Sequence, residues 1–265
     1  MDVHAADAGL PNSLLDYLTR SSELAPRLLA LSRRSSYGTA LVSHSAARMR
    51  PPVERPSKII CIGLNYRDHA AEVGLPLPTA LSVFAKYANV LIGDGDAIVR
   101  PAESVELDYE AELAIIVGKR GRHIAEGDAY AHVAGYTIFN DVSVRDFQMR
   151  TSQWTIGKTF DTHGPCGPVL VTADAITDPH RLGIRLTVGN ETLQDSNTEQ
   201  MVFTVPRLIA ELSAVMTLEP GDVIATGTPP GVGMSRTPRR WLLPGERVRI
   251  EIEGIGALEN PVRAA

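Results

Sequence analysis

Cysteine is scarce in this sequence, and the spacings that cysteine-dependent sites require are absent. The 265 residues include two cysteines, Cys61 and Cys166, which lie far apart in the chain and form no CxxC pair. Such a pattern favours neither a disulfide framework nor a cysteine-based zinc site. Both side chains are therefore predicted to be buried thiols in a reducing compartment.

Long apolar runs, a secretory leader and basic clusters are missing as well. No run approaches the roughly 20 apolar residues that a membrane span needs. The first residues, MDVHAADAGLPNS, have neither a basic start nor an apolar core. The formal net charge is -5, and no dense basic run is present, which argues against nucleic-acid binding. These absences predict a cytoplasmic protein that binds neither membranes nor nucleic acids.

Several familiar catalytic and nucleotide-binding motifs are also absent. The sequence has no GxSxG elbow, no P-loop and no GxGxxG fingerprint. The glycine-rich residues 227–233, GTPPGVG, contain two prolines, which lack the backbone N–H groups that a phosphate cradle uses. A rigid loop is favoured there over a nucleotide site.

The chain divides into two regions of different character. Residues 1–55 carry leucines at helical spacing and end in the proline-rich stretch RPPVERP, which stops helices and favours an extended connector. From Lys58 onward, short apolar runs alternate with turns. We therefore predict a small helical segment over residues 1–55 and a second, larger domain over residues 56–265; the family resemblance described below implies that the first is variable and the second catalytic.

The second region predicts a β-rich α+β fold. Helical patterns do not alternate with strands regularly enough for a doubly wound sheet. One strong helix is expected, at residues 205–215, where apolar side chains share a face. The predicted strands are residues 59–64, 82–86, 112–117, 136–139, 182–188, 191–194, 223–226 and 248–253.

Two carboxylates stand at the head of the apolar run DYEAELAIIVG. Glu110 and Glu112 are two residues apart, so in a strand they project from the same face. A third carboxylate, Asp141, follows another short predicted strand. Three oxygen ligands without His or Cys suit Mg²⁺ or Mn²⁺ better than zinc. The alternative is an exposed strand face, with Asp141 merely capping a helix.

A helix is predicted to begin at Asn140 and Asp141. In that helix Asp141, Arg145 and Gln148 share one face, which offers a carboxylate, a guanidinium and an amide. Such a set could hold a metal-bound carboxylic acid. An ordinary Asp–Arg pair on a solvated helix face is the alternative.

The segment GLNYRDHAAE contains a possible acid–base pair. His69 and Glu72 are i, i+3 neighbours on a predicted helix, where the carboxylate can orient the imidazole and raise its basicity. Gly63, Gly74 and Pro76 bracket a segment that could move as a lid. A surface pair without function is the alternative.

An ordered series of motifs carries a resemblance to a known family. Residues 58–260 resemble the fumarylacetoacetate hydrolase family, which includes acylpyruvate hydrolases and the mammalian oxaloacetate decarboxylase. The motifs are GLNYRDHAAE, the ExE of DYEAELAIIVG, GYTIFNDVSVRDFQ, QWTIGKTFDTHGPCGP, QDSNT, VPRLIAELS, TLEPGDVIATGTPPGVG and LLPGERVRIEIEGIGALEN.

The resemblance implies a mixed β-roll fold, a homodimer and a metal-dependent enzyme that acts on small oxo acids. It also implies a set of functional residues. These are Glu110, Glu112 and Asp141 as ligands of Mg²⁺ or Mn²⁺; His69, Glu72 and Lys158 in catalysis; and Arg145, Gln148, Lys86 and Thr228 in substrate binding.

The implied activity is hydrolysis of a C–C bond in a 2,4-dioxo acid of the acylpyruvate or fumarylpyruvate type. The 2-oxo acid would chelate the metal, and His69 with Glu72 would activate a water that attacks the distal carbonyl. Lys158 would supply positive charge to the developing enolate. Because related reactions share that enolate, decarboxylation of oxaloacetate and hydration or isomerisation of hydroxydienoic acids stay open. A non-enzymatic binding role is the remaining alternative.

Overall fold

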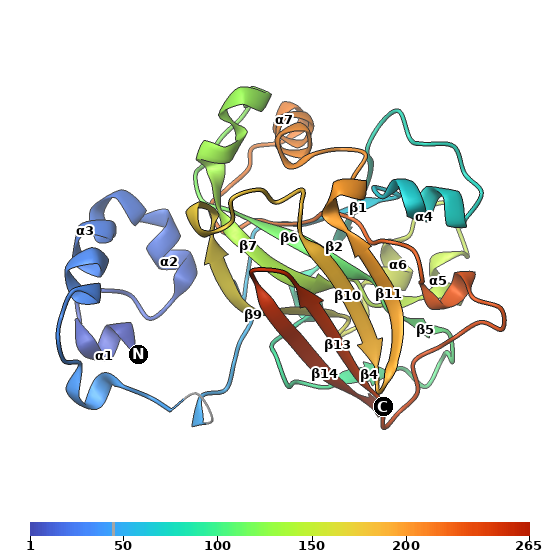
Figure 1. Cartoon of the computed structure of the whole chain (residues 1–265), viewed down its shortest axis with the longest axis horizontal. Coiled ribbons are helices and arrows are strands. Elements are labelled where there is room, and N and C mark those ends of the chain that lie inside the picture. The colour runs from blue at the N-terminus through green and yellow to red at the C-terminus, as the bar shows by residue number, and fades with distance from the viewer. Residues whose placement is uncertain (44–45) are drawn as a thin grey trace.

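Two β-sheets packed face to face form the body of the protein in the computed structural model, which describes residues 1–43 and 46–265 (Figure 1). The larger sheet has the strand order β2-β1-β12-β6-β7-β9-β3, and the smaller one β11-β10-β13-β14-β4. The strands of the larger sheet are β1 (Ile59–Gly63), β2 (Ser82–Lys86), β3 (Leu91–Ile92), β6 (Ala111–Val117), β7 (Val133–Asn140), β9 (Gly164–Thr172) and β12 (Val223–Ala225). Those of the smaller sheet are β4 (Ile98–Arg100), β10 (Gly183–Val188), β11 (Glu191–Asn197), β13 (Arg247–Ile252) and β14 (Gly256–Ala264). A separate pair joins β5 (Leu107–Asp108) to β8 (Ser143–Val144).

Strand β6 lies in the middle of the larger sheet and is buried on both faces. Its side chains alternate between two hydrophobic cores, as the period-2 geometry of a strand requires. Leu113 and Ile115 face the core between the two sheets, whereas Ala114 and Ile116 face the core on the other side. Glu112 is therefore on the same face as Ala114 and Ile116.

The main helix, α7 (Val205–Val215), covers one edge of the inter-sheet core. Its residues Leu208, Ile209 and Leu212 are buried on one face, in agreement with the predicted helical spacing. Short 3-10 turns occur at Gly38–Ala40, Ala88–Val90, Glu126–His132, Ala173–Ala175, Thr198–Gln200 and Gly233–Ser235.

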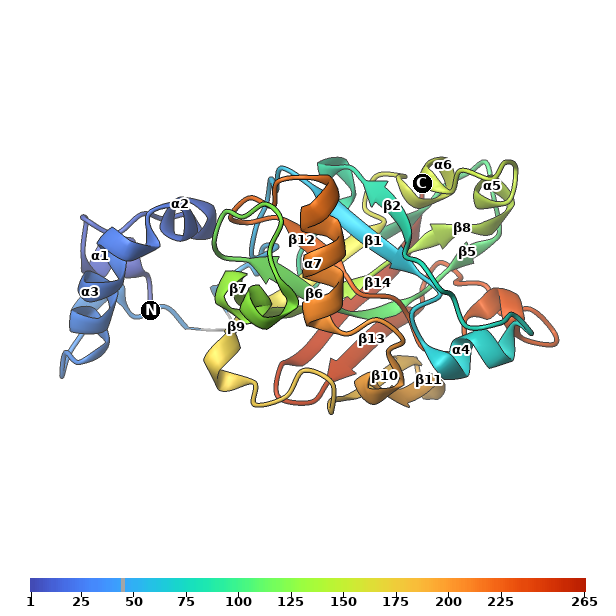
Figure 2. The same ribbon diagram turned by 90° about the horizontal axis from the view of Figure 1, so that it is seen from above.

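Three short helices gather at one end of the body: α4 (Arg67–Glu72), α5 (Arg145–Gln148) and α6 (Thr155–Lys158). The N-terminal helices α1 (Val3–Ala6), α2 (Leu14–Thr19) and α3 (Ser21–Ser32) lie at the opposite end (Figures 1 and 2). No helix in the described residues is both long and apolar enough to cross a bilayer.

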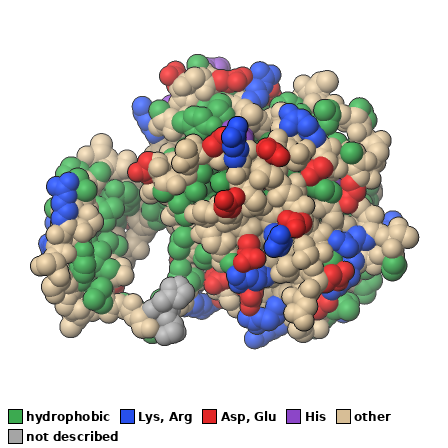
Figure 3. Space-filling model, viewed as in Figure 1, with side chains coloured by type: hydrophobic (Ala, Val, Ile, Leu, Met, Phe, Trp, Pro, Cys, Tyr) green, Lys and Arg blue, Asp and Glu red, His purple; other side chains and the backbone are tan. Residues whose placement is uncertain are grey.

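The N-terminal helices form a small lobe with a core of its own. Leu10, Leu24 and Leu31 are buried together there. Leu18 of α2 packs instead on the outer face of the larger sheet, which ties the lobe to the body. Hydrophobic side chains gather on the side of the lobe that faces the body (Figure 3). The proposed domain boundary after residue 55 stays a prediction.

The predicted β-rich α+β class is confirmed, and most predicted elements agree with the structure to within a few residues. One prediction is wrong: no helix begins at Asn140–Asp141. The chain instead passes through β8, and α5 begins at Arg145. Asp141 therefore lies in a connection rather than on a helix face, because β8 pairs with β5 and keeps the backbone extended.

Strand β9 escaped prediction because its sequence, GPCGPVLVT, contains two glycines and two prolines. These residues are depleted in strands, but tertiary pairing with β7 overrides that preference. Both cysteines are free and buried, as expected, and burial raises the pKa of each thiol.

Truncation at the centre of β6 tests the importance of this strand. Ile115 is fully buried, so Ile115→Ala should lower the free energy of unfolding by about 3 kcal/mol, through lost apolar contact and the cavity left behind. Ile156→Ala is the matched control, because that side chain is 62% exposed and its loss should cost less than ~0.5 kcal/mol. Urea denaturation followed by circular dichroism measures both. Equal losses in the two variants would contradict the central role of β6.

Candidate active site and metal centre

Three buried carboxylates converge at the end of the larger sheet. Glu110, Glu112 and Asp141 each offer one oxygen, and these oxygens lie within 4.8 Å of one another. Glu112 and Asp141 are almost completely buried, and Glu110 is 7% exposed. The alternative of an exposed, solvated strand face is therefore excluded by the structure.

The pairing of β6 with β7 creates this cluster. Ala111 is opposite Asn140 in the ladder, so the residues that flank this pair meet at the end of the two strands. The N–H of Asp141 donates to the carbonyl of Glu110 at 2.9 Å, and the N–H of Glu110 donates to Asn140 Oδ1 at 3.1 Å. A residue 29 positions further along the chain is thereby fixed beside the two glutamates.

Two buried lysines bridge and hold these carboxylates. Lys158 Nζ lies 2.7 Å from Glu110 Oε2 and 2.8 Å from Asp141 Oδ2. Lys86 Nζ donates to Asp141 Oδ1 at 2.6 Å and to the carbonyl of Val142 at 3.0 Å. Both oxygens of Asp141 are thus paired with ammonium groups, which fixes the orientation of its carboxylate.

Arg145 completes the buried network on the other side of Glu110. Its Nε donates to Asp108 Oδ2 at 2.7 Å, and its Nη1 donates to Gln148 Oε1 at 2.8 Å. Its Nη2 lies 2.7 Å from Glu110 Oε1, but the N–H bonds do not point at that oxygen. Among the described residues, Nη2 is therefore a buried donor in an ion pair but without a hydrogen bond.

The neighbouring charges separate the acidities of the two glutamates. Burial would raise the pKa of Glu110, but Lys158 and Arg145 outweigh it and lower that pKa to about 2. Burial and the nearby carboxylates of Asp141 and Glu110 raise the pKa of Glu112 well above its usual value. Glu110 is consequently ionised, whereas Glu112 holds its proton more tightly than an ordinary glutamate.

The charge balance of the cluster suits a bound cation. Glu112 accepts a hydrogen bond from the N–H of Gly227 at 2.9 Å and has no cationic side chain at ion-pair distance within the described part of the chain. Carboxylate oxygens are the ligands that Mg²⁺ and Mn²⁺ prefer, so the donor set fits such an ion. Four buried carboxylates, Asp108, Glu110, Glu112 and Asp141, share three buried cations, Lys86, Arg145 and Lys158.

Close packing of two short helices positions Lys158. A side chain at Gly157 would lie 2.3 Å from the backbone nitrogen of Gln148, so only glycine lets α6 approach α5 this closely. This contact explains why the motif QWTIGKTFDTHGPCGP contains a glycine directly before the lysine. Lys158 Nζ also lies 5.1 Å from the centre of the Phe84 ring.

The segment predicted to act as a lid, residues 63–76, carries the predicted histidine–glutamate pair on α4. His69 Nδ1 lies 2.9 Å from Glu72 Oε2, so the carboxylate can fix the ring orientation. The other oxygen, Glu72 Oε1, accepts a hydrogen bond from the N–H of Gly231 at 2.8 Å. Glu72 therefore orients the imidazole and holds the lid against the glycine-rich loop.

A cavity of about 220 Å³ connects the lid with the carboxylates. Lys86 is not part of its wall, since it lies behind Asp141, and neither Glu72 nor Asp141 is exposed to it. The predicted site residues that do line the cavity are His69, Glu110, Glu112, Arg145, Gln148, Lys158 and Thr228.

Three further residues contribute to the site without having been predicted. Asp108 holds Arg145 and also accepts the N–H of Gly233 at 2.7 Å, which ties β5 to the glycine-rich loop. Gln194 Nε2 donates to Thr228 Oγ1 at 2.8 Å, and Trp154 lines the cavity. Asp108 begins the DYEAE motif, so a third carboxylate in that short stretch was an available signal.

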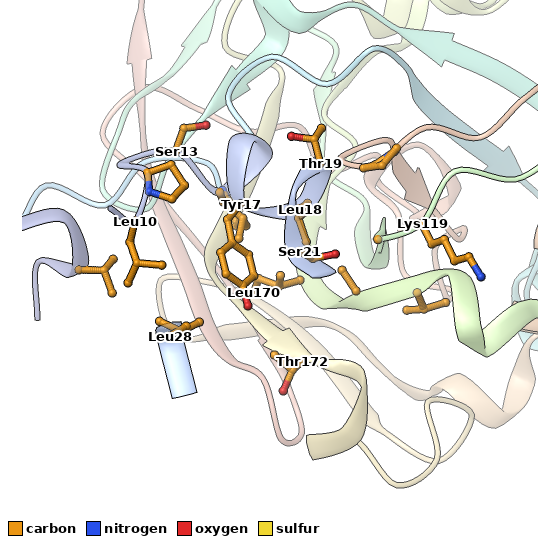
Figure 4. Close-up of a pocket in the computed structure, with 18 of the residues that line it drawn as sticks. Leu10, Ser13, Tyr17, Leu18, Thr19, Ser21, Leu28, Lys119, Leu170 and Thr172 are labelled. Atoms are coloured by element: carbon orange, nitrogen blue, oxygen red, sulfur yellow. The ribbon is translucent and has the colours of Figure 1, made fainter. Parts of the chain in front are cut away.

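A larger cavity lies elsewhere, between the N-terminal lobe and strand β9 (Figure 4). Its volume is about 1010 Å³, and its walls include Tyr17, Leu28 and Leu170. The carboxylate cluster contributes nothing to this wall, so the charged chemistry belongs to the smaller cavity.

Proton release on metal binding tests the assignment of Glu112. A metal ligand must be ionised, and the raised pKa of Glu112 means that a proton has to leave first. Affinity for Mn²⁺ should therefore fall as the pH drops through that raised pKa. Calorimetry in two buffers of different ionisation enthalpy measures the released proton.

Glu112→Gln should abolish this proton release. It should also weaken Mn²⁺ binding by more than ~10-fold, because changes outside the ligand shell already cost that much. Glu191→Gln, on the exposed face of β11, is the control and should behave as the wild type. Unchanged Mn²⁺ binding in Glu112→Gln would show that Glu112 is not a ligand.

Comparison with known proteins identifies relatives over nearly the whole chain. Residues 58–263 match the family described as fumarylacetoacetate (FAA) hydrolase, C-terminal. The chain is 47% identical over 265 residues to the oxaloacetate tautomerase of Xenopus laevis. The aligned region covers 99% of this chain and 82% of that protein.

Two solved structures share the fold. The fumarylacetoacetate hydrolase of the psychrophile Exiguobacterium antarcticum is 38% identical, with a TM-score of 0.83 over 96% of this chain and 89% of that one. The maleylpyruvate hydrolase of Sphingobium sp. SYK-6 is 33% identical, with a TM-score of 0.80 over 99% of this chain and 91% of that one.

The predicted cytoplasmic location is wrong by this comparison, because the Xenopus laevis tautomerase is mitochondrial by name. The prediction rested on the missing secretory leader, but mitochondrial import uses a different kind of targeting segment. The composition of a folded domain does not distinguish these two compartments.

The family match over residues 58–263, the 47% identity to the tautomerase and the agreement in fold lead to one conclusion. This protein is an enzyme of the fumarylacetoacetate hydrolase family.

Proposed function

We propose that this protein catalyses metal-dependent proton transfer at the carbon next to the keto group of a 2-oxo acid, with oxaloacetate as the type of substrate. The observation that carries the proposal is that His69 lines the same cavity as Glu110 and Glu112. A general acid–base and a cation-binding carboxylate pair therefore face the same small space. The similarity to the oxaloacetate tautomerase supports this reaction ahead of C–C hydrolysis.

The substrate carboxylate would bind on the α5 side of the cavity. Arg145 Nη2 is buried and paired with Glu110 Oε1 at 2.7 Å, and Gln148 accepts from Arg145 through its Oε1, which leaves the amide N–H groups of Gln148 to donate to the substrate. A guanidinium and an amide together match the geometry of a carboxylate. A divalent cation held by Glu110, Glu112 and Asp141 would supply Lewis acidity toward the keto and carboxylate oxygens.

His69 would move the proton. Its ring is oriented by Glu72 at 2.9 Å, which leaves Nε2 to take a proton from the carbon and deliver it to the keto oxygen, or to carry it back in the reverse direction. The enolate formed on proton removal carries negative charge, which the buried ammonium group of Lys158, in the wall of the cavity, would stabilise. Among σ bonds only C–H and O–H are broken or formed, while the C=O π bond is exchanged for a C=C π bond, so proton transfer accounts for the conversion.

Removal of the imidazole tests this role. His69→Ala should lower kcat for keto–enol interconversion of oxaloacetate by ~10²–10⁴-fold, because the general base is lost. The rate is followed by the ultraviolet absorbance of the enol. Mn²⁺ affinity should stay unchanged, since His69 is not among the carboxylate ligands. His132→Ala, whose ring bonds to the carbonyl of Lys119, is the control. A wild-type rate in His69→Ala would refute the assignment.

Hydrolysis of a C–C bond in a 2,4-dioxo acid is the second candidate. The same His69–Glu72 pair could take a proton from water, which would attack the carbonyl at C4. Breaking the C3–C4 bond would release a carboxylic acid and the enolate of pyruvate, which is protonated to pyruvate. The likeness in fold to a maleylpyruvate hydrolase supports this alternative.

A substrate panel separates the two candidates. With Mg²⁺ present, we expect oxaloacetate enol–keto conversion to exceed the release of pyruvate from acylpyruvates, and both to stop with a chelator. Exchange of the C3 hydrogens of oxaloacetate for deuterium in D₂O measures proton transfer without hydrolysis. If acylpyruvates are cleaved rapidly while oxaloacetate is not turned over, hydrolysis is the function.

A further inference from the structure

The indole of Trp154 forms a wall of the small cavity. Trp154 stands directly before α6, four residues from Lys158, and both side chains line the cavity. Its ring meets Phe84 edge-on, with centroids 5.5 Å apart and an interplanar angle of 68°. Phe84 also lines the cavity, so two aromatic rings in mutual contact form one wall.

Gly63 fixes how far this ring lies from the centre of the cavity. A side chain at Gly63 would lie 2.5 Å from Trp154 Cζ3 and 3.0 Å from its Cη2. The indole therefore rests directly on the backbone at the end of β1, and no other residue would leave room for it there. Gly63 does not have a positive φ, so an alanine would be opposed chiefly by the ring, with Ser82 Oγ at 3.3 Å as a weaker contact, and not by backbone strain.

The cavity is small, and most of the uncharged side chains that line it are apolar. Its volume of about 220 Å³ is below the ~300–1,000 Å³ typical of ligand pockets. The charged residues gather around the carboxylate cluster, where the 2-oxo acid group would bind. The rest of the cavity leaves little space for a substrate that carries a long group beyond its 2-oxo acid head. The apolar side chains of the wall are Ile62, Leu64, Val73, Leu75, Phe84, Met149, Trp154, Val232 and Met234.

We propose that Trp154, seated on Gly63, is the residue that sets the length of substrate this enzyme accepts. It limits the enzyme to 2-oxo acids with a compact group beyond the reacting carbon and excludes acids with an aromatic or long acyl tail. The inference rests on the proposed function, because it assumes that the 2-oxo acid group binds at the carboxylate cluster.

Two inert ligands of different length test this wall. Oxalate carries only the chelating head, whereas oxanilate carries the same type of head with a phenyl group and has no hydrogen on carbon next to a keto group. Binding of each is measured by calorimetry with Mg²⁺ present, in the full-length protein. Wild type should bind oxalate and discriminate against oxanilate.

Trp154→Ala should bind oxanilate ~10-fold more tightly than wild type does, since removal of the indole opens apolar space. Its affinity for oxalate should remain within about threefold of wild type, because the head does not use the wall. In turnover assays, Trp154→Ala should have a lower KM for aryl-substituted 2-oxo acids than wild type has, whereas kcat should stay the same. Trp241→Phe, at the other tryptophan of the chain, is the control and should leave both affinities unchanged.

Gly63→Ala tests the same contact from the opposite side. The new methyl group should push the indole into the cavity and weaken binding of both ligands by ~10-fold or more. The double variant Gly63→Ala/Trp154→Ala should regain the affinities of Trp154→Ala, because the colliding ring is gone. This rescue distinguishes a wall from a general loss of structure.

The outcomes distinguish failure of the proposed function from failure of the proposed limit on substrate length. If oxalate does not bind the wild type with Mg²⁺, the proposed function fails, and the substrate limit fails with it. If oxalate binds normally but Trp154→Ala gains nothing for oxanilate, the substrate limit alone is overturned. Failure of the double variant to regain oxalate binding also overturns it.

Discussion

The antiparallel pairing of β6 with β7 is the interaction on which the active site depends. It brings Asp141 beside Glu110 through a backbone hydrogen bond of 2.9 Å, while Glu112 projects from the interior of β6. A shift of one residue in this register would move Glu112 to the opposite face of the sheet. The complete burial of β6 between two hydrophobic cores makes such a shift unfavourable, so packing energy secures the geometry of the carboxylates.

Burial of so many charges requires compensation, and this requirement connects stability to chemistry. Carboxylates removed from water are costly unless they are paired and hydrogen-bonded. Lys86 and Lys158 pair with Asp141, and Arg145 pairs with Asp108 and Glu110. Glu112 lacks such a partner and its pKa is raised, so a cation that binds there would replace the proton of Glu112. The groups that make burial possible are also those that would neutralise an anionic substrate.

Short helices held by close contacts surround this cluster. α5 and α6 each have four residues and could not be stable alone, so their positions come from packing, as at Gly157. The lid differs, because α4 is joined to the glycine-rich loop through Glu72 and the N–H of Gly231. Glu72 thus contacts both the ring of His69 and the glycine-rich loop. The N-terminal lobe lies at the other end of the body, away from these groups (Figure 2).

The sequence by itself determined the β-rich class, the helix at residues 205–215 and the i, i+3 relation of His69 to Glu72, because each depends on local periodicity. It also put Glu110 and Glu112 on one face, since that follows from the pleat of a strand. Only the tertiary structure decided that Asp141 joins them from a connection rather than a helix, since strand register is set by contacts distant in sequence. The roles of Lys86 behind Asp141, Asp108 beneath Arg145 and Gly63 under Trp154 were likewise hidden, because each arises from elements that meet only when the sheets close.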